Sequence, residues 1–277
     1  MLVSTAELAT HLDDPSWVIF DCRHDLTDPI KGQNVYSTSH ITGAFFAGVD
    51  RDLSGEKTGN NGRHPLPDPA VFADFLARCG VTAKSRIVAY DDVGGQYAAR
   101  LWWMTRWIGQ PNAAVLDGGW PKWNTAGLPT SFEIPAAASG AVSVKLNPSL
   151  LASTADVEHI LESGGGQIVD ARAPERYRGE VEPLDPVAGH IPGAANHFFK
   201  RSLRHDLTFK PSAEIREDFG SSLANRAPGE VIHQCGSGIT ACVNLFAMEL
   251  AGLSGSKLYA GSWSEWVADQ DRPVSRG

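Results

Sequence analysis

The feature of this sequence that most limits its possible folds is that the second half repeats the first. Four segments recur in the same order and at nearly constant spacing: Asp21 and Asp170 are 149 residues apart, and Asp91 and Cys235 are 144 apart. Such agreement indicates a tandem duplication. The paired segments are VIFDCRHD and IVDARAPE, SHITGAFF and GHIPGAAN, IVAYDDVGGQYAAR and VIHQCGSGITACVN, and LDGGWPKW and YAGSWSEW.

Each copy predicts an α/β domain, because short apolar runs typical of buried parallel strands alternate with segments of helical periodicity. We therefore expect two similar domains, each a parallel sheet with helices on both faces. Residues 1–130 form the first domain, 131–148 a Pro-, Ala- and Gly-rich linker, and 149–277 the second domain. The expected strands are 17–20, 87–90, 113–116, 167–169, 231–233 and 257–259, and the expected helices include 69–79, 96–108, 154–163 and 240–251.

Composition excludes several classes of protein. A formal net charge of -8 argues against nucleic acid or an anionic membrane as the partner. No apolar run has the roughly 20 residues that a membrane helix needs, and the N-terminus does not resemble a signal peptide. The four cysteines form no CxxC pair and no zinc-binding pattern, so we expect reduced thiols, a cytoplasmic location, no metal and no cofactor.

The segment most informative about chemistry surrounds Cys235. An apolar strand ends at Gln234, Cys235 follows, Gly236 and Gly238 loosen the backbone, and a helix begins near Thr240. Such a loop points successive backbone N–H groups inward, and the positive end of the helix dipole favours the thiolate form of a cysteine there. We therefore predict that Cys235 is a nucleophile, whereas Cys22, Cys79 and Cys242 serve packing.

The loop sequence CGSGIT resembles the active-site loop of the mercaptopyruvate sulfurtransferases of the rhodanese family. DAR at 170–172, GHIPGA at 189–194 and GSWSEW at 261–266 are similar to further marks of that family. The resemblance spans almost the whole chain. It implies two rhodanese-like domains with the active site at their interface, on the loop of the second domain. The first copy has Asp91 at the cysteine position, which implies that this copy is catalytically silent because an aspartate forms no persulfide.

The same resemblance implies roles for other residues. Arg178 is similar to the arginine that binds the anionic group of the donor, and backbone N–H groups of Gly236, Gly238, Ile239 and Thr240 would hold the sulfur. Ser237, His64 and Asp52 resemble a proton relay whose histidine and aspartate come from the first domain, with Asp50 as the rival aspartate. A second family arginine is absent, because Leu184 stands there; Lys200, Arg201 or Arg204 are candidates to replace its charge.

These features predict an enzyme that moves a sulfane sulfur from a small anionic donor, 3-mercaptopyruvate, through a Cys235 persulfide. The acceptor would be cyanide, a thiol or a thioredoxin-like protein. Thiosulfate is the alternative donor, which the missing arginine at Leu184 favours. A cysteine phosphatase would need an arginine six places after Cys235, where Ala241 stands. A non-catalytic rhodanese-like binding module is the remaining alternative.

Overall fold

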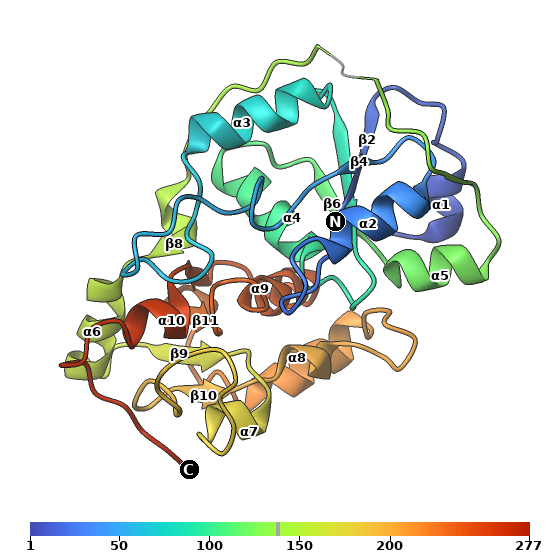
Figure 1. The fold of residues 1–277 in the computed structure, drawn as a ribbon. Helices are drawn as coiled ribbons and strands as arrows, with labels where there is room; N and C mark the ends of the chain where they lie inside the picture. Colours follow the sequence, from blue (N-terminus) through green and yellow to red (C-terminus); the bar gives the residue numbers. More distant parts are fainter. Residues whose placement is uncertain (137–138) are drawn as a thin grey trace. The chain divides into compact units, whose positions relative to one another are not determined.

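The structure is a computed structural model that describes residues 1–136 and 139–277, and the chain in it divides into two compact units (Figure 1). The sequence boundaries did not anticipate that each copy contributes a short segment to the other unit. The first unit comprises Met1–Gly55, Leu66–Asn147 and His205–Phe209. The second unit comprises Glu56–Pro65, Pro148–Arg204 and Lys210–Gly277.

The first unit is built on a parallel five-stranded sheet in the order β1-β6-β5-β2-β4. Its central strands are the buried apolar runs expected from the sequence, since Val18, Ile19 and Phe20 of β2 are almost fully buried. The strands are β1 (Leu2–Val3), β2 (Trp17–Asp21), β4 (Phe45–Phe46), β5 (Arg86–Tyr90) and β6 (Ala113–Leu116).

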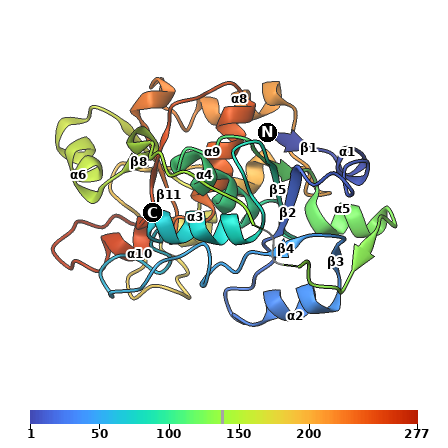
Figure 2. The same cartoon turned by 90° about the horizontal axis from the view of Figure 1, so that it is seen from above.

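Helices cover both faces of this sheet, as predicted (Figure 2). On one face, Leu8 of α1 and Trp123 of α5 pack with Ile19 and Val88. On the other face lie α3 and α4, and the ring of Phe75 is 5.7 Å from that of Phe20. Helices of this unit are α1 (Thr5–Ala9), α2 (Lys31–Thr38), α3 (Pro69–Arg78), α4 (Ala98–Trp107) and α5 (Gly119–Thr125).

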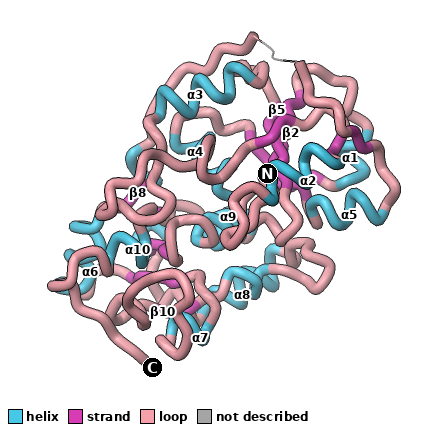
Figure 3. The backbone as a smooth tube through the Cα atoms, viewed as in Figure 1, coloured by secondary structure: helices cyan, strands magenta, loops and turns pink. Residues whose placement is uncertain are grey.

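The second unit repeats the design with the strand order β10-β9-β11-β12-β8, again parallel. Figure 3 distinguishes helices, strands and loops along the chain by colour. Helices α6 and α10 cover one face through Val157, Trp263 and Trp266, and α8 and α9 cover the other. Its strands are β8 (Leu151–Ala152), β9 (Gln167–Asp170), β10 (Ala195–Asn196), β11 (Val231–Gln234) and β12 (Lys257–Tyr259). Its helices are α6 (Thr154–Ser163), α7 (Pro174–Tyr177), α8 (Ser212–Gly220), α9 (Ala241–Leu250) and α10 (Ser262–Trp266).

The predicted linker, residues 131–148, contains Ala137 and Ala138, which lie outside the described residues. Its described parts are held by the first unit. Strand β7 (Thr130–Ser131) pairs antiparallel with β3 (His40–Ile41), and Asn147 N–H donates to the carbonyl of Trp107. Among residues 1–136 and 139–277, no helix is both long and apolar enough to cross a membrane.

Both units contain the same buried charged pair at the end of the strand next to the central one, which is β9 in the second unit and β2 in the first. In the second unit, Arg172 donates to Asp170 (2.7 Å) and to the carbonyl of Gly189, and its guanidinium stacks 4.7 Å from the ring of Trp263. In the first unit, Arg23 and Asp21 repeat the pair, with Trp120 as the stacking ring. Asp170 and Arg172 therefore serve the structure of the second unit.

We expect Asp170→Ala to destabilise the second unit strongly, because the buried Arg172 would lose its principal counter-ion. Breaking a buried pair by removing one partner costs about 3–5 kcal/mol. Urea unfolding followed by tryptophan fluorescence measures this change. Glu180→Ala, which removes the partner of an exposed arginine, is the control and should leave the unfolding midpoint unchanged. Equal midpoints for Asp170→Ala and the wild type would contradict the structural role.

Candidate active site

The loop that carries Cys235 joins β11 to α9 and is tied to the start of α10. Cys235 N–H donates to Oγ of Ser262 (3.1 Å), and the Cys235 carbonyl accepts from the N–H of Trp263 (3.0 Å). The next carbonyl, that of Gly236, accepts from Ser264 N–H (3.0 Å). The cysteine side chain is only 2% exposed. Its position is therefore fixed by backbone hydrogen bonds on both sides.

Two residues of this region have left-handed backbone conformations that the loop requires. Gly238 has φ +74°, and a Cβ at this position would lie 2.3 Å from the carbonyl oxygen of Ala260. Ser262 has φ +55°, although it is not a glycine. The corresponding residue of the first copy, Gly119, has φ +52°. Ser262 thus adopts a backbone conformation that is unfavourable for any residue with a Cβ atom, and its Oγ accepts a hydrogen bond from the backbone N–H of Cys235.

The matching loop of the first unit contains an anion of its own, the carboxylate of Asp91. This carboxylate accepts hydrogen bonds of 2.7–2.9 Å from four backbone N–H groups, and burial raises the pKa of Asp91 while these bonds oppose the shift. The donors are the N–H groups of Val93, Gly95, Tyr97 and Ala98. At the 144-residue offset, these positions correspond to Ser237, Ile239, Ala241 and Cys242. A loop of this sequence pattern can therefore gather N–H groups around a negative charge.

The structure brings Ser237 and His64 together. Nδ1 of His64 lies 2.7 Å from Oγ of Ser237, and both side chains are about 5% exposed. His64 belongs to residues 56–65, which are part of the second unit, so the expectation that the first domain would supply this histidine needs correction. The segment is held to the second unit because Arg63 N–H donates to Oγ of Ser264.

Two guanidinium groups lie against Gly236, beside Cys235. A Cβ built on Gly236 would be 2.8 Å from Nη2 of Arg63 and 3.4 Å from both Nη atoms of Arg176. Arg176 donates to Glu182 (2.6 Å), and Arg63 forms an ion pair with Asp185. Sequence reasoning missed both arginines, although Arg63 is adjacent to His64 and Arg176 is only two residues from Arg178.

The cations named from the sequence are placed on the surface instead. The side chain of Arg178 is 43% exposed, and its Nε donates to Oε1 of Glu180 (2.7 Å). Arg201 lies 3.8 Å from Asp218, and Arg204 lies 4.0 Å from Glu214. Lys200 is exposed near the ring of Phe199. These contacts leave Arg63 and Arg176 as the cations observed against the loop.

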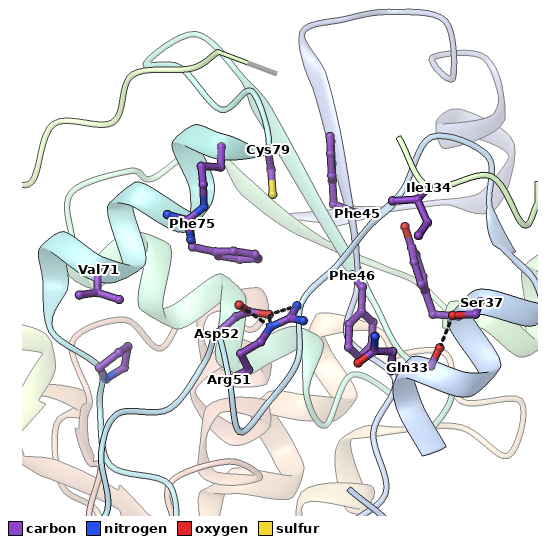
Figure 4. Close-up of a pocket in the computed structure, with 13 residues that line it drawn as sticks. Gln33, Ser37, Phe45, Phe46, Arg51, Asp52, Val71, Phe75, Cys79 and Ile134 are labelled. Carbon is purple, nitrogen blue, oxygen red and sulfur yellow. Dashed lines mark hydrogen bonds and ion pairs between the residues drawn. The ribbon is translucent and has the colours of Figure 1, made fainter. Parts of the chain in front are cut away.

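Asp52 lies in the first unit and lines a cavity of about 490 Å³ there (Figure 4). Its carboxylate accepts from the guanidinium of Arg51 (2.7 Å) and from the N–H of Gly48 (2.8 Å). The rival residue, Asp50, has a 39% exposed side chain and lies 3.9 Å from Nε2 of His24. Aromatic rings of Phe45, Phe46 and Phe75 form much of the cavity wall.

The chain is similar to known proteins over its whole length. Residues 4–126 and 153–269 each match the Rhodanese-like domain family. The chain is 44% identical, over 100% of its length and 98% of the relative, to a Pseudomonas aeruginosa protein named "Probable 3-mercaptopyruvate sulfurtransferase". A Mycobacterium tuberculosis protein whose provisional name is thiosulfate sulfurtransferase SseB is 36% identical over 100% of this chain and 97% of its own. The crystal structure of the Escherichia coli 3-mercaptopyruvate sulfurtransferase SseA superimposes with a TM-score of 0.83 at 30% identity, covering 95% of this chain and 98% of that one.

We expect Gly238→Ala to distort the loop, because the added methyl group would collide with the Ala260 carbonyl and the left-handed backbone disfavours alanine. Differential scanning calorimetry should show a Tm several degrees below that of the wild type. The matched control is Gly220→Ala at the end of α8, where a Cβ meets nothing within 4 Å. If the two variants had equal Tm values, the close approach at Gly238 would not be a structural requirement.

Proposed function

This chain belongs to the rhodanese family, and from that premise we propose that it is a sulfurtransferase that takes sulfur from 3-mercaptopyruvate and carries it as a persulfide on Cys235. The observation that carries the proposal is the position of Cys235. It occupies the place at which the first unit holds the Asp91 carboxylate with four backbone N–H groups. The second unit has a reactive thiol in the corresponding place.

The burial of Cys22 and Cys79 supports this choice of nucleophile. Burial raises the pKa of Cys79 to about 12, and it raises the pKa of Cys22 well above its usual value. Both residues therefore remain thiols at neutral pH, and a thiol is a poor nucleophile. Cys242 lies inside α9, and its Sγ donates to the carbonyl of Gly238 (3.3 Å). Its surroundings fit the packing role that the sequence predicts.

In the first half-reaction, the Cys235 thiolate attacks the donor sulfur. A sulfur–sulfur bond forms, the carbon–sulfur bond of mercaptopyruvate breaks, and its electron pair leaves with the enolate of pyruvate. The enolate then takes a proton and becomes pyruvate. Ser237 and His64, which share a 2.7 Å hydrogen bond, can polarise the donor carbonyl and deliver this proton.

In the second half-reaction, a thiol, cyanide or a thioredoxin-like protein attacks the outer sulfur. The sulfur–sulfur bond breaks, and the electron pair returns to Cys235 as thiolate. Backbone N–H groups of Gly236, Gly238, Ile239 and Thr240 are the proposed holders of the persulfide anion. Of these, Ile239 corresponds to Gly95, whose N–H binds the Asp91 carboxylate in the first unit. A covalent intermediate of this kind predicts ping-pong kinetics.

We assign the anionic group of the donor to Arg176 rather than to Arg178. The guanidinium of Arg176 lies 3.4 Å from a Cβ built on Gly236, whereas Arg178 is paired with Glu180 on the surface. A planar guanidinium suits a carboxylate, which it can bind through two parallel hydrogen bonds. Asp52 as the third relay member, the identity of the acceptor and the cytoplasmic location stay predictions.

Cys235→Ser should abolish persulfide formation and turnover, because serine cannot store the sulfur. Intact-mass measurement after addition of 3-mercaptopyruvate, without acceptor, should show about 32 Da added to the wild type and none to the variant. Cys79→Ser is the matched control and should still gain the sulfur. A wild type that gains no mass from mercaptopyruvate or from thiosulfate would favour a non-catalytic binding module. If the wild type gained the mass of one sulfur atom from thiosulfate but not from 3-mercaptopyruvate, thiosulfate would be the donor.

Arg176→Ala should raise KM for 3-mercaptopyruvate by about tenfold or more, since a charge-assisted hydrogen bond to the donor is lost. Arg178→Ala should leave KM within about twofold of the wild-type value, because exposed ion pairs contribute little. Steady-state kinetics with cyanide as acceptor measures both. The reverse pattern would restore Arg178 as the donor-binding arginine.

A further inference from the structure

The cavity of about 490 Å³ in the first unit lies between α2 and α3, beside the edge strand β4 (Figure 4). Its lining residues fall within 33–52 and 67–79, and Ile134 completes them, so all belong to the first unit. Cys235 and His64 belong to the second unit. Pockets that bind small molecules usually have volumes of about 300–1,000 Å³. The cavity thus has the size of a binding site, and it is built from other residues than the loop of Cys235.

Aromatic side chains form much of the cavity wall. The rings of Phe45, Phe46 and Phe75 line it. The ring of Tyr36 also lines it, with its centroid 5.3 Å from that of Phe46. The hydroxyl group of Tyr36 donates to the carbonyl of Ala44 (2.8 Å), so the polar end of this side chain is already paired. Phe45 and Phe46 are only partly buried, and a bound aromatic ring would take their remaining surface out of water.

The opening of the cavity is also apolar. Val71 is 59% exposed and Ile134 is 73% exposed, although both line the cavity. Figure 4 shows these two side chains on opposite sides of it. Apolar side chains that are exposed together around a cavity are typical of a surface that binds apolar groups. A ligand with an apolar body would cover them.

The charged side chains that line the cavity are those of Arg51, Asp52 and Arg78. Arg51 and Asp52 neutralise each other, because Nη2 of Arg51 donates to Oδ2 of Asp52 (2.7 Å). Arg78, the last residue of α3, forms no ion pair with an acidic side chain in the described part of the chain. The thiol of Cys79 adds no charge, since burial raises its pKa to about 12. The lining therefore has a surplus of one positive charge.

We propose that this cavity binds a small aromatic monocarboxylate, whose ring lies among Phe45, Phe46 and Phe75 and whose carboxylate pairs with Arg78. One negative charge on the ligand matches the one surplus positive charge of the lining. A planar guanidinium suits a carboxylate, with which it forms two parallel hydrogen bonds. A neutral ligand would leave Arg78 unpaired, and an anion without a ring would leave the aromatic wall in contact with water. Binding here goes beyond the proposed function and does not depend on it, because Cys235 takes no part.

Calorimetric titration of the full chain with three compounds tests both parts of this ligand. 2-Naphthoate has a ring system and a carboxylate, 2-naphthamide has the ring system without the charge, and acetate has the charge without the ring system. We expect 2-naphthamide to bind about fivefold more weakly than 2-naphthoate, because the ion pair with an exposed arginine contributes modestly. Acetate should bind at least about a hundredfold more weakly, because it buries no ring.

Two results of this titration would overturn the proposal. Equal affinities for 2-naphthoate and 2-naphthamide would show that the charge is not recognised. An affinity for acetate equal to that for 2-naphthoate, or no binding of 2-naphthoate at all, would show that the aromatic wall binds no ring. Because no sulfur donor is present, a protein that fails in sulfur transfer can still pass this test, and an active enzyme can still fail it.

Arg78→Ala should lower the affinity for 2-naphthoate about fivefold and leave that for 2-naphthamide unchanged, since only the carboxylate contacts this residue. Lys84→Ala removes another exposed cation of the first unit, outside the cavity, and is the matched control. It should leave both affinities unchanged. An Arg78→Ala variant that binds 2-naphthoate as tightly as the wild type would refute the role of Arg78.

A second variant shows where in the chain the anion binds. Arg176 lies against the Cys235 loop and is itself a cation to which 2-naphthoate can bind. Arg176→Ala should leave the affinity for 2-naphthoate unchanged if the ligand occupies the cavity of the first unit. Loss of affinity in Arg176→Ala, with none in Arg78→Ala, would place the compound at the Cys235 loop and overturn the proposal.

Discussion

In the first unit, the turn between β5 and α4 directs backbone N–H groups towards one point, where the Asp91 carboxylate lies. Such a cluster of donors needs a negative group, because unpaired buried N–H groups are costly. In the first unit the Asp91 carboxylate satisfies four of them permanently. In the second unit Cys235 stands in that position, where an anion is present only when the thiol or its persulfide is ionised.

The same turn explains why several neighbouring residues are constrained. Gly238 leaves room for the Ala260 carbonyl, and Ser262 adopts a left-handed conformation in which its hydroxyl binds Cys235 N–H. Behind the loop, the buried pair of Asp170 and Arg172 fixes the end of the adjacent strand. Each feature limits movement of the Cys235 backbone, so the position of this cysteine is set by the fold of the second unit.

Much of this could be predicted from the sequence, because the relevant signals are local. Strands β2, β5, β6, β9, β11 and β12 lie where apolar runs of three or four residues indicated, and α3, α4, α6 and α9 begin and end within two residues of the expected positions. Helix α6 begins at a capping box formed by Ser153 and Asp156, a pattern readable from sequence. Cys235 could be predicted as the nucleophile because the glycines and the strand–helix transition mark the loop directly, whereas the role of Ser237 was predicted from the family resemblance.

The cations were harder to predict because their positions depend on tertiary contacts. Arg176 and Arg178 are two residues apart, so they point to different sides of one helical turn, and only packing decides which faces Gly236. Arg63 belongs to a segment that crosses from the first copy to the second unit, so no repeat or spacing rule could place it at the loop.

Residues 56–65 belong to the first sequence copy but are part of the second unit, and this arrangement bears on how the site evolved. In a duplicated domain, the loop between strand and helix is part of the fold itself. The charged side chains around that loop can come from any chain segment that packs against it. Asp185 lies within ion-pair distance of both Arg63 and Arg176, so cations from both sequence copies share one counter-ion. The loop that carries Cys235 thus comes from one sequence copy, whereas one of the two guanidinium groups that lie against it, that of Arg63, comes from the other.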